Sequence, residues 1–334
     1  MTLAHSTCRK RSLVSGFGII EIMVALALGA VLLLGVTEIF SNNSLTRAEV
    51  ERTSLQIESG AYALGLLEGE LANAGYWGEA DERPADTASL PPVCPITAAE
   101  IEAAMGYPVQ GAGAAACMVS PKAGTDYIAI RRANSCAFDS CPAPVPDFAF
   151  YMQVNACFNP LDPDEDPPGV TVYIRQTPGE MANLATGSRL ANFGAQRDCT
   201  TAAPIYGLHN RVFYVNSDDE LVRAELTEDG YIQTVLVEGV EMMAFEYGID
   251  QDGDGQVDVQ ASPGTDPVSW SNVSMVRVSL VIRNLESTAG YLDNRSYRVA
   301  GNDYTVPAAL QSHKRQVYSR TVGLRNVAGR RELP

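Results

Sequence analysis

The stretch that decides the fold is residues 17–40, FGIIEIMVALALGAVLLLGVTEIF. It contains no Lys, Arg or Pro, and its only charged residues are Glu21 and Glu38. A helix needs roughly 20 predominantly apolar residues to cross the hydrocarbon core of a bilayer. The sequence therefore predicts a transmembrane helix over residues 17–40.

Three basic residues, Arg9, Lys10 and Arg11, precede this run. By the positive-inside rule they keep the first residues in the cytoplasm and place everything after Phe40 outside. A secretory signal is an alternative, but its apolar region is typically about 7–15 residues long and ends at a small-x-small cleavage site. A plain single-pass anchor fits the hydropathy equally well.

Neither alternative explains Glu21, a carboxylate near the start of the apolar run. A charge inside a membrane segment costs about 2.5–3.5 kcal/mol on insertion scales, so such an acid indicates a function and a partner. The string from Gly16 to Glu21, GFGIIE, follows a short basic leader and precedes an unbroken apolar run. This combination resembles the class III signal of type IV pilins and pseudopilins.

The resemblance implies a role for each residue of the string. A prepilin peptidase would cut after Gly16 and methylate Phe17, which removes residues 1–16 as a leader peptide. Glu21 would then pair with the N-terminal amine of a neighbouring subunit. In lipid, an ammonium and a carboxylate from adjacent helices remove each other's unpaired charge, and such a pair would fix the stagger between subunits.

No proline occurs from Phe17 to Arg83, so the helix can continue beyond the membrane over residues 41–75. Asn73 and Gly75 supply a stop. An amphipathic stripe follows helical intervals, and we expect it to pack on partner helices before Leu55 and on the head after it. Its members are Leu45, Ala48, Leu55, Tyr62 and Leu66.

Residues 76–334 form the predicted head, in which β-branched and aromatic residues mark strand-like runs. The runs are 127–131, 148–154, 170–176, 211–215, 220–226, 231–237, 241–248, 273–283 and 316–324. An acidic, Pro-rich loop at 161–169 interrupts them. Short connections favour a mainly antiparallel sheet, and the predicted fold class is α+β, with the long helix packed on that sheet.

Three segments extend the resemblance to PilW-type minor pilins: AGYWG at 74–78, VEGVEMMAFEYGIDQDGDGQVD at 237–258 and RQVYSRTVGLRN at 315–326. They imply a minor pilin that takes part in initiating type IV pilus assembly, and hence cell adhesion and twitching motility. Its implied partners are other minor pilins, the major pilin and a tip adhesin. A J-type pseudopilin of a type II secretion system is the nearest alternative. Residues 85–210 resemble no family.

Six cysteines would remain after the leader, with its Cys8, is removed. They lie in loop-like segments between residues 94 and 199, as expected for disulfides formed in an oxidising compartment such as the periplasm. The cysteines are Cys94, Cys117, Cys136, Cys141, Cys157 and Cys199. Buried free thiols remain an alternative. The pairing is open, although Cys136 with Cys141 closes the shortest loop.

The segment IDQDGDGQVD, residues 249–258, carries alternate carboxylates. Asp250, Asp252, Asp254 and Asp258 match positions 1, 3, 5 and 9 of an EF-hand loop, with Gln256 at position 7. Position 12 is Ala261 instead of Glu, so the last ligand would be water or a distant acid such as Asp266. We expect a structural calcium ion here; a solvated acidic turn is the alternative.

The net charge of −16 argues against nucleic acid as a partner, because an acidic surface repels phosphates. His209 and His313 are isolated, and no hydrolase, zinc-protease or phosphate-binding motif occurs. We therefore expect no enzyme activity. The class that competes with a pilin is a calcium-dependent adhesive protein tethered to the inner membrane by one helix.

Overall fold

The computed structural model describes residues 16, 18–78, 80, 88–138, 140–142, 147–155, 171–176, 196 and 201–331. Several features predicted from the sequence lie outside the described residues. They are the leader before Gly16, Phe17, the acidic loop at 161–169, and the cysteines Cys157 and Cys199.

One long helix, α1 (Ile19–Ala72), opens the fold. Its 54 residues contain no proline, so every turn can keep its backbone hydrogen bonds. The chain divides into two compact units, residues 1–52 and 53–334, and α1 contributes to both. Within the first unit the large apolar side chains are exposed; Ile19 is 80% exposed and Phe40 is 74% exposed. Among the described helices, α1 alone is long and apolar enough to span a membrane.

Within the second unit α1 has a buried face formed by residues three or four positions apart. Its members are Gln56, Gly60, Ala63, Leu64, Leu67 and Leu71. Of the predicted stripe, Leu66 is partly buried against this core, whereas Leu55 and Tyr62 are more than half exposed. The buried face includes an amide and a glycine, which an apolar pattern does not reveal.

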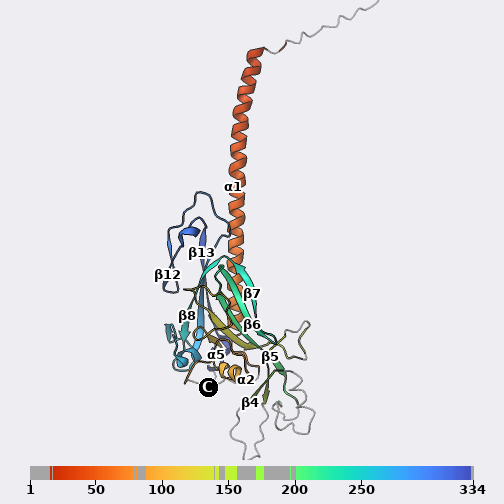
Figure 1. The fold of residues 1–334 in the computed structure, drawn as a ribbon, viewed down its shortest axis with the longest axis vertical. Coiled ribbons are helices and arrows are strands. Elements are labelled where there is room, and N and C mark those ends of the chain that lie inside the picture. The colour runs from red at the N-terminus through yellow and green to blue at the C-terminus, as the bar shows by residue number, and fades with distance from the viewer. Residues whose placement is uncertain are drawn as a thin grey trace, which may run out of the picture. The chain divides into compact units, whose positions relative to one another are not determined.

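The second unit is built mainly from antiparallel strands (Figure 1). The larger sheet has the strand order β1 (Val109–Gln110), β2 (Ile128–Ala133), β5 (Ile205–Val215), β3 (Tyr151–Asn155) and β4 (Thr171–Arg175). Strand β5 also pairs with β6 (Glu220–Thr227), and β6 pairs with β7 (Gly230–Glu238). A second sheet has the order β13 (Arg315–Gly323), β10 (Val273–Arg283), β8 (Val240–Ile249) and β9 (Val259–Ala261). The hairpin of β11 (Ser296–Val299) and β12 (Asn302–Thr305) is separate.

Short helices complete the unit: α2 (Ala98–Ala104), α4 (Pro267–Ser271), α5 (Arg325–Arg331) and the 3-10 helix η2 (Ala308–Leu310). The α+β class with antiparallel sheets is confirmed. The sequence missed β1, β9, β11 and β12, each of four residues or fewer. So few residues give too short an alternation to stand out from a loop.

The main core lies between the second half of α1 and the inner faces of both large sheets. Leu67 and Leu71 of α1 are fully buried there, together with Phe213 of β5 and Val278 of β10. Burying side chains of this size contributes about 1.5–3 kcal/mol each. The α1 turns from Ala63 onward are therefore part of the head.

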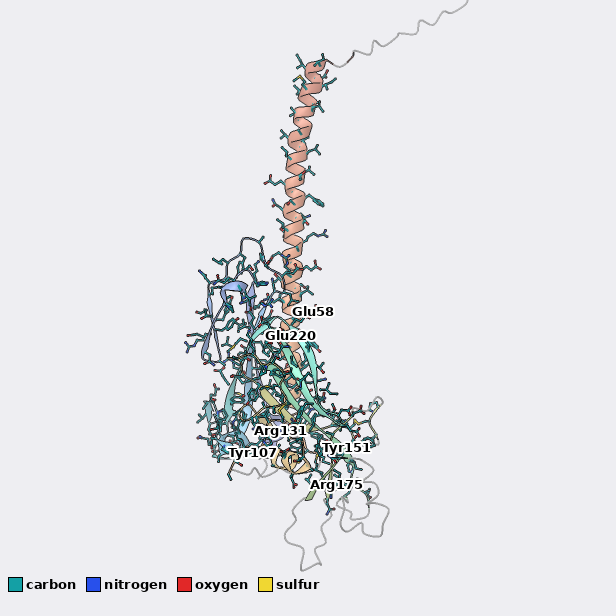
Figure 2. The ribbon with its side chains drawn as sticks, in the orientation of Figure 1. Glu58, Tyr107, Arg131, Tyr151, Arg175 and Glu220 are labelled. Atoms are coloured by element: carbon teal, nitrogen blue, oxygen red, sulfur yellow. A yellow bond between two sulfur atoms is a disulfide. The ribbon has the colours of Figure 1, made fainter. Side chains whose placement is uncertain are left out.

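A buried guanidinium holds the loop that precedes β2. Arg131, 2% exposed, donates from Nε to Asn210 Oδ1 (2.8 Å), from Nη1 to the Tyr107 carbonyl (2.8 Å) and from Nη2 to Gln110 Oε1 (2.9 Å). Nη2 also lies 3.3 and 3.4 Å from the carbonyls of residues 92 and 93. Figure 2 labels Arg131 and Tyr107. Burial lowers the pKa of Arg131 to about 10, so it stays protonated at neutral pH.

Two disulfides fasten loops of the second unit. Cys94 pairs with Cys117, and Cys136 pairs with Cys141. The first joins the loop before α2 to the loop after β1, beside a small core cluster on the outer face of β5 and β6. The prediction of disulfides is confirmed for these four cysteines.

Candidate functional site

Glu21 lies in the first turn of α1, two residues after the helix begins. A carboxylate is favourable at a helix N-terminus, where the backbone N–H groups carry a partial positive charge. Gly16, the residue before the predicted cleavage position, lies before the helix and is exposed. The structure therefore places the one acid of the signal at the very start of the apolar run.

The predicted cation ligands form the turn that follows β8. Carboxylate oxygens of Asp250, Asp252 and Asp254 lie within 4.8 Å of one another. Asp250 is fully buried, and its two oxygens accept hydrogen bonds from the N–H groups of Gly253 (2.7 Å) and Gly255 (3.0 Å). Both glycines have positive φ, 83° and 87°, which favours glycine over other residues.

The other predicted ligands are not part of this group of three carboxylates. Asp258 Oδ2 accepts a hydrogen bond from the Gln251 N–H (2.7 Å), and the Gln256 N–H donates to Asp254 Oδ1 (2.8 Å). Asp266 caps the N-terminus of α4 through its side chain. The turn thus brings together three of the predicted carboxylates.

Arg331 of α5 already supplies one positive charge to this turn. Its Nη1 lies 3.1 Å from Asp250 Oδ2, and its Nη2 donates to the Ser271 carbonyl (3.1 Å). Burial alone would raise the pKa of Asp250, but Arg331 and the two glycine N–H groups outweigh it and lower that pKa. Asp250 is therefore ionised and held in place at neutral pH.

A second group of charged side chains lies where α1 ends, on the sheet face that α1 covers. Arg132 of β2 contacts Glu70 of α1 (Nε to Oε2, 3.4 Å), and Arg211 of β5 also pairs with Glu70. Arg211 Nε donates to Glu225 Oε1 of β6 (2.7 Å), and His209 Nδ1 lies 3.0 Å from the same oxygen. These ion pairs connect the last turn of α1 to three strands.

Burial lowers the pKa of His209 from 6.5 to about 4, so its imidazole is neutral at pH 7. Burial alone would raise the pKa of Glu225, but the hydrogen bond with His209 and the charge of Arg211 outweigh it and lower that pKa to about 2. Glu225 is thus ionised, while His209 serves as its neutral hydrogen-bond partner. His313, by contrast, is partly buried and lies 3.3 Å from the Leu310 carbonyl.

A cavity of about 380 Å³ opens beside this cluster. It is lined by Asp147, Phe148, Arg211, Arg223, Glu225, Thr227, Glu228, Asp229 and Ile232. Sequence reasoning missed both the cluster and the cavity, because their residues come from separate elements. One signal was available: His209 and Arg211, like Arg223 and Glu225, are two positions apart and so share one face of a strand.

Comparison with known proteins identifies the C-terminal part of the chain. Residues 212–326 match the family model described as Type IV Pilus-assembly protein W. This region is similar to the PilW family. No curated protein matches the sequence. Among solved structures, a type IV-like pilin from Thermus thermophilus aligns over 83% of this chain and 97% of its own, with 11% identity and a TM-score of 0.34.

The resemblance to PilW-type pilins inferred from the sequence is confirmed by this match. The PilW region begins within β5 and ends at the start of α5, so it contains the acidic turn at 250–258 and β7. Two of the segments that suggested the family, 237–258 and 315–326, fall inside it. Glu21 and both disulfides lie outside the matched residues.

Proposed function

We propose that this protein is a minor pilin that helps to initiate type IV pilus assembly from the inner membrane. The observation that carries the proposal is the position of Glu21, the only acid in the first turn of the 54-residue helix α1. The part of α1 that lies in the first unit of the chain has exposed apolar side chains. The PilW match at the other end of the chain supports the same role.

In the proposed mechanism, cleavage after Gly16 creates a new amine at Phe17, which is then methylated. Glu21 of one subunit pairs with this amine on a neighbour, and the two helices pack side by side. Because an unpaired carboxylate costs about 2.5–3.5 kcal/mol in the membrane, the pair favours one stagger over others. Other minor pilins, the major pilin and a tip adhesin are the proposed partners, with the head in the periplasm.

The first test is the mass and N-terminal sequence of the protein extracted from membranes, with and without prepilin peptidase. We expect a chain that begins at Phe17 and carries one added methyl group only when the peptidase is present. A retained leader, or cleavage beyond Phe40, would contradict the proposal.

The second test compares Glu21→Gln with Glu38→Gln, the two carboxylates of the apolar run. In cells that lack the native gene, Glu21→Gln should abolish pili recovered by shearing and co-purification of other pilins. Glu38→Gln should support both, because it lies far from the new N-terminus. Equal behaviour of the two variants would remove the assigned role of Glu21.

We also propose a structural calcium ion at the acidic turn. The convergence of three carboxylates within 4.8 Å favours it, and water would complete the ligand shell. Asp250 would be shared between the ion and Arg331, whose single charge leaves the four Asp of the turn with a net charge of −3.

Calcium should raise the melting temperature of the full chain in detergent micelles, since a ligand of the native state stabilises it. Magnesium should do so less, because it requires a smaller octahedral site. Asp252→Asn with Asp254→Asn should remove the calcium effect, whereas Asp218→Asn with Asp303→Asn should keep it. An unchanged melting temperature at millimolar calcium would exclude this site.

A further inference from the structure

Strand β7 leaves one long side of the larger sheet without a neighbour. It pairs with β6 along Gly230–Glu238 and with no other strand among the described residues. An edge strand offers a row of N–H and C=O groups that can pair with another chain. Over 231–235 its register with β6 is regular, so this row is not interrupted by a bulge there.

The other described sheet edges are poorer templates. Strands β1 and β9 have two and three residues, and β4 has five. Strand β13 is long but carries the exposed Arg320, and charged side chains discourage pairing at an edge. The middle of β7 contains no charged residue and no proline.

The side chains of β7 add apolar surface on both faces of this edge. Ile232 is 50% exposed on the face that carries Glu225, and Val235 is 50% exposed on the opposite face. A strand added to β7 would cover both, because neighbouring strands lie about 4.8 Å apart. Pairing would therefore bury apolar area in addition to forming backbone hydrogen bonds.

The cavity described above lies at the hairpin end of the same strand, where Ile232 forms part of its lining. Its lining includes four carboxylates and two guanidinium groups, a net charge of −2. The Glu225 carboxylate already interacts with Arg211, Arg223 and His209. The exposed Asp147, Glu228 and Asp229 form no ion pair with any residue that the structure describes.

The lining therefore suits a cation with an apolar stem. Phe148 and Ile232 can contact methylene groups, while the three free carboxylates surround the charged end. A Lys or Arg side chain has this form. An acidic side chain would be repelled by the same groups.

We propose that β7 accepts an extended segment of a partner chain as an added strand, and that this segment places a Lys or Arg side chain in the adjacent cavity. Backbone pairing supplies the affinity, and the cavity supplies the specificity for a segment with a basic side chain, as in other cases of β-strand addition. This inference goes beyond the proposed function, since the site lies entirely in the second unit and does not depend on Glu21.

The test uses the full chain in detergent micelles and a fluorescently labelled nine-residue peptide of alternating Thr and Val, with one Lys near each end so that either strand direction can place a Lys. Fluorescence anisotropy measures binding. We expect replacement of both Lys by Glu to abolish binding. A peptide with N-methyl groups on alternate residues, which keeps the side chains but lacks edge donors, should bind at least tenfold more weakly.

The matched protein variants are Glu228→Gln with Asp229→Asn, which remove two charges of the cavity, and Asp218→Asn with Asp303→Asn, which remove two exposed charges elsewhere. The first pair should weaken binding about tenfold and the second should leave it unchanged. The proposal is overturned if the Lys and Glu peptides bind equally, if N-methylation has no effect, or if β7 is already occupied by a second copy of the protein. None of these outcomes bears on the Glu21→Gln test.

Discussion

The two halves of α1 show how one helix can belong to two environments. Leu32 in the first unit is 69% exposed, whereas Leu67 in the second unit is fully buried among strands of both sheets. Both are leucines in regular helix, and only the surroundings differ. Apolar content alone therefore does not say whether a helical segment serves the head or a membrane; burial in the folded unit does.

The largest expected effect tests this contrast directly. Leu67→Ala should lower the free energy of unfolding of the second unit by about 3 kcal/mol, because it leaves a cavity in the core. Leu32→Ala should leave it unchanged. Both Trp77 and Trp270 are buried in the second unit, so urea unfolding in micelles followed by Trp fluorescence reports that unit alone. Equal losses would show that the halves are not energetically distinct.

Two glycines within the second half sharpen the comparison. A Cβ at Gly60 would lie 2.5 Å from Cζ of Tyr318, whereas one at Gly65 would meet nothing within 4 Å. Gly60→Ala should therefore cost about 2 kcal/mol through overpacking. Gly65→Ala should gain up to about 1 kcal/mol from helix propensity.

The same unfolding assay checks the glycine pair, with Tyr318→Ala as a second substitution. If the ring is the cause, Gly60→Ala should cost much less in the Tyr318→Ala background, giving a coupling in the double-mutant cycle. Additive losses would place the cause elsewhere.

A smaller effect is expected at the end of the helix. Glu70→Gln should cost about 1.5 kcal/mol, since it leaves the guanidinium groups of Arg132 and Arg211 without their shared carboxylate. Glu58→Gln removes an exposed charge of the same helix and should change the free energy of unfolding by less than about 0.5 kcal/mol. Melting curves of the two variants in the same buffer measure this difference in stability.

The smallest effect concerns acid. Since the pKa of His209 falls from 6.5 to about 4 on folding, the unfolded chain binds this proton first as the pH drops. The stabilisation that neutral His209 contributes is fully present above pH 6.5 and is lost as the pH falls towards 4. The free energy of unfolding should therefore decrease by about 1 kcal/mol from pH 7 to pH 5.5. Glu225, with its lowered pKa, adds a further loss between about 4.5 and 2.

His209→Gln should remove the pH dependence between 7 and 5.5, measured as the urea midpoint at each pH. His313→Gln is the control and should retain it. A wild-type midpoint that does not change over this range would exclude the buried neutral imidazole.

Long, strongly patterned segments were predictable from the sequence. The run at 273–283 coincides with β10, and the absence of proline allowed the helix that ends at Ala72. These elements have enough residues for their period to be recognised. The start of the buried face of α1 was not found from the sequence. Gln56 is buried because it donates hydrogen bonds to the Ile282 and Lys314 carbonyls, and Gly60 is buried because the Tyr318 ring packs against it.

The candidate sites were predictable only where their residues are close in sequence. The three carboxylates that come together in the acidic turn were named from the sequence, but the sequence could not show that Asp266 caps α4 or that Arg331 reaches Asp250. The cavity beside β7 draws on β5, β6, β7 and the segment before β3, which the sheet order alone brings together. Contacts of this kind depend on topology, which a local pattern does not contain.

The guanidinium of Arg131 has a consequence for how the surface of the head can vary. Its acceptors are mostly backbone carbonyls, which every residue type provides, so the path of the loop around α2 depends little on the side chains that point outward. Ile96, before α2, and Ala99 and Ala103, within α2, are exposed. Exchanging these side chains would change the outer surface of the head while the backbone beneath keeps its path.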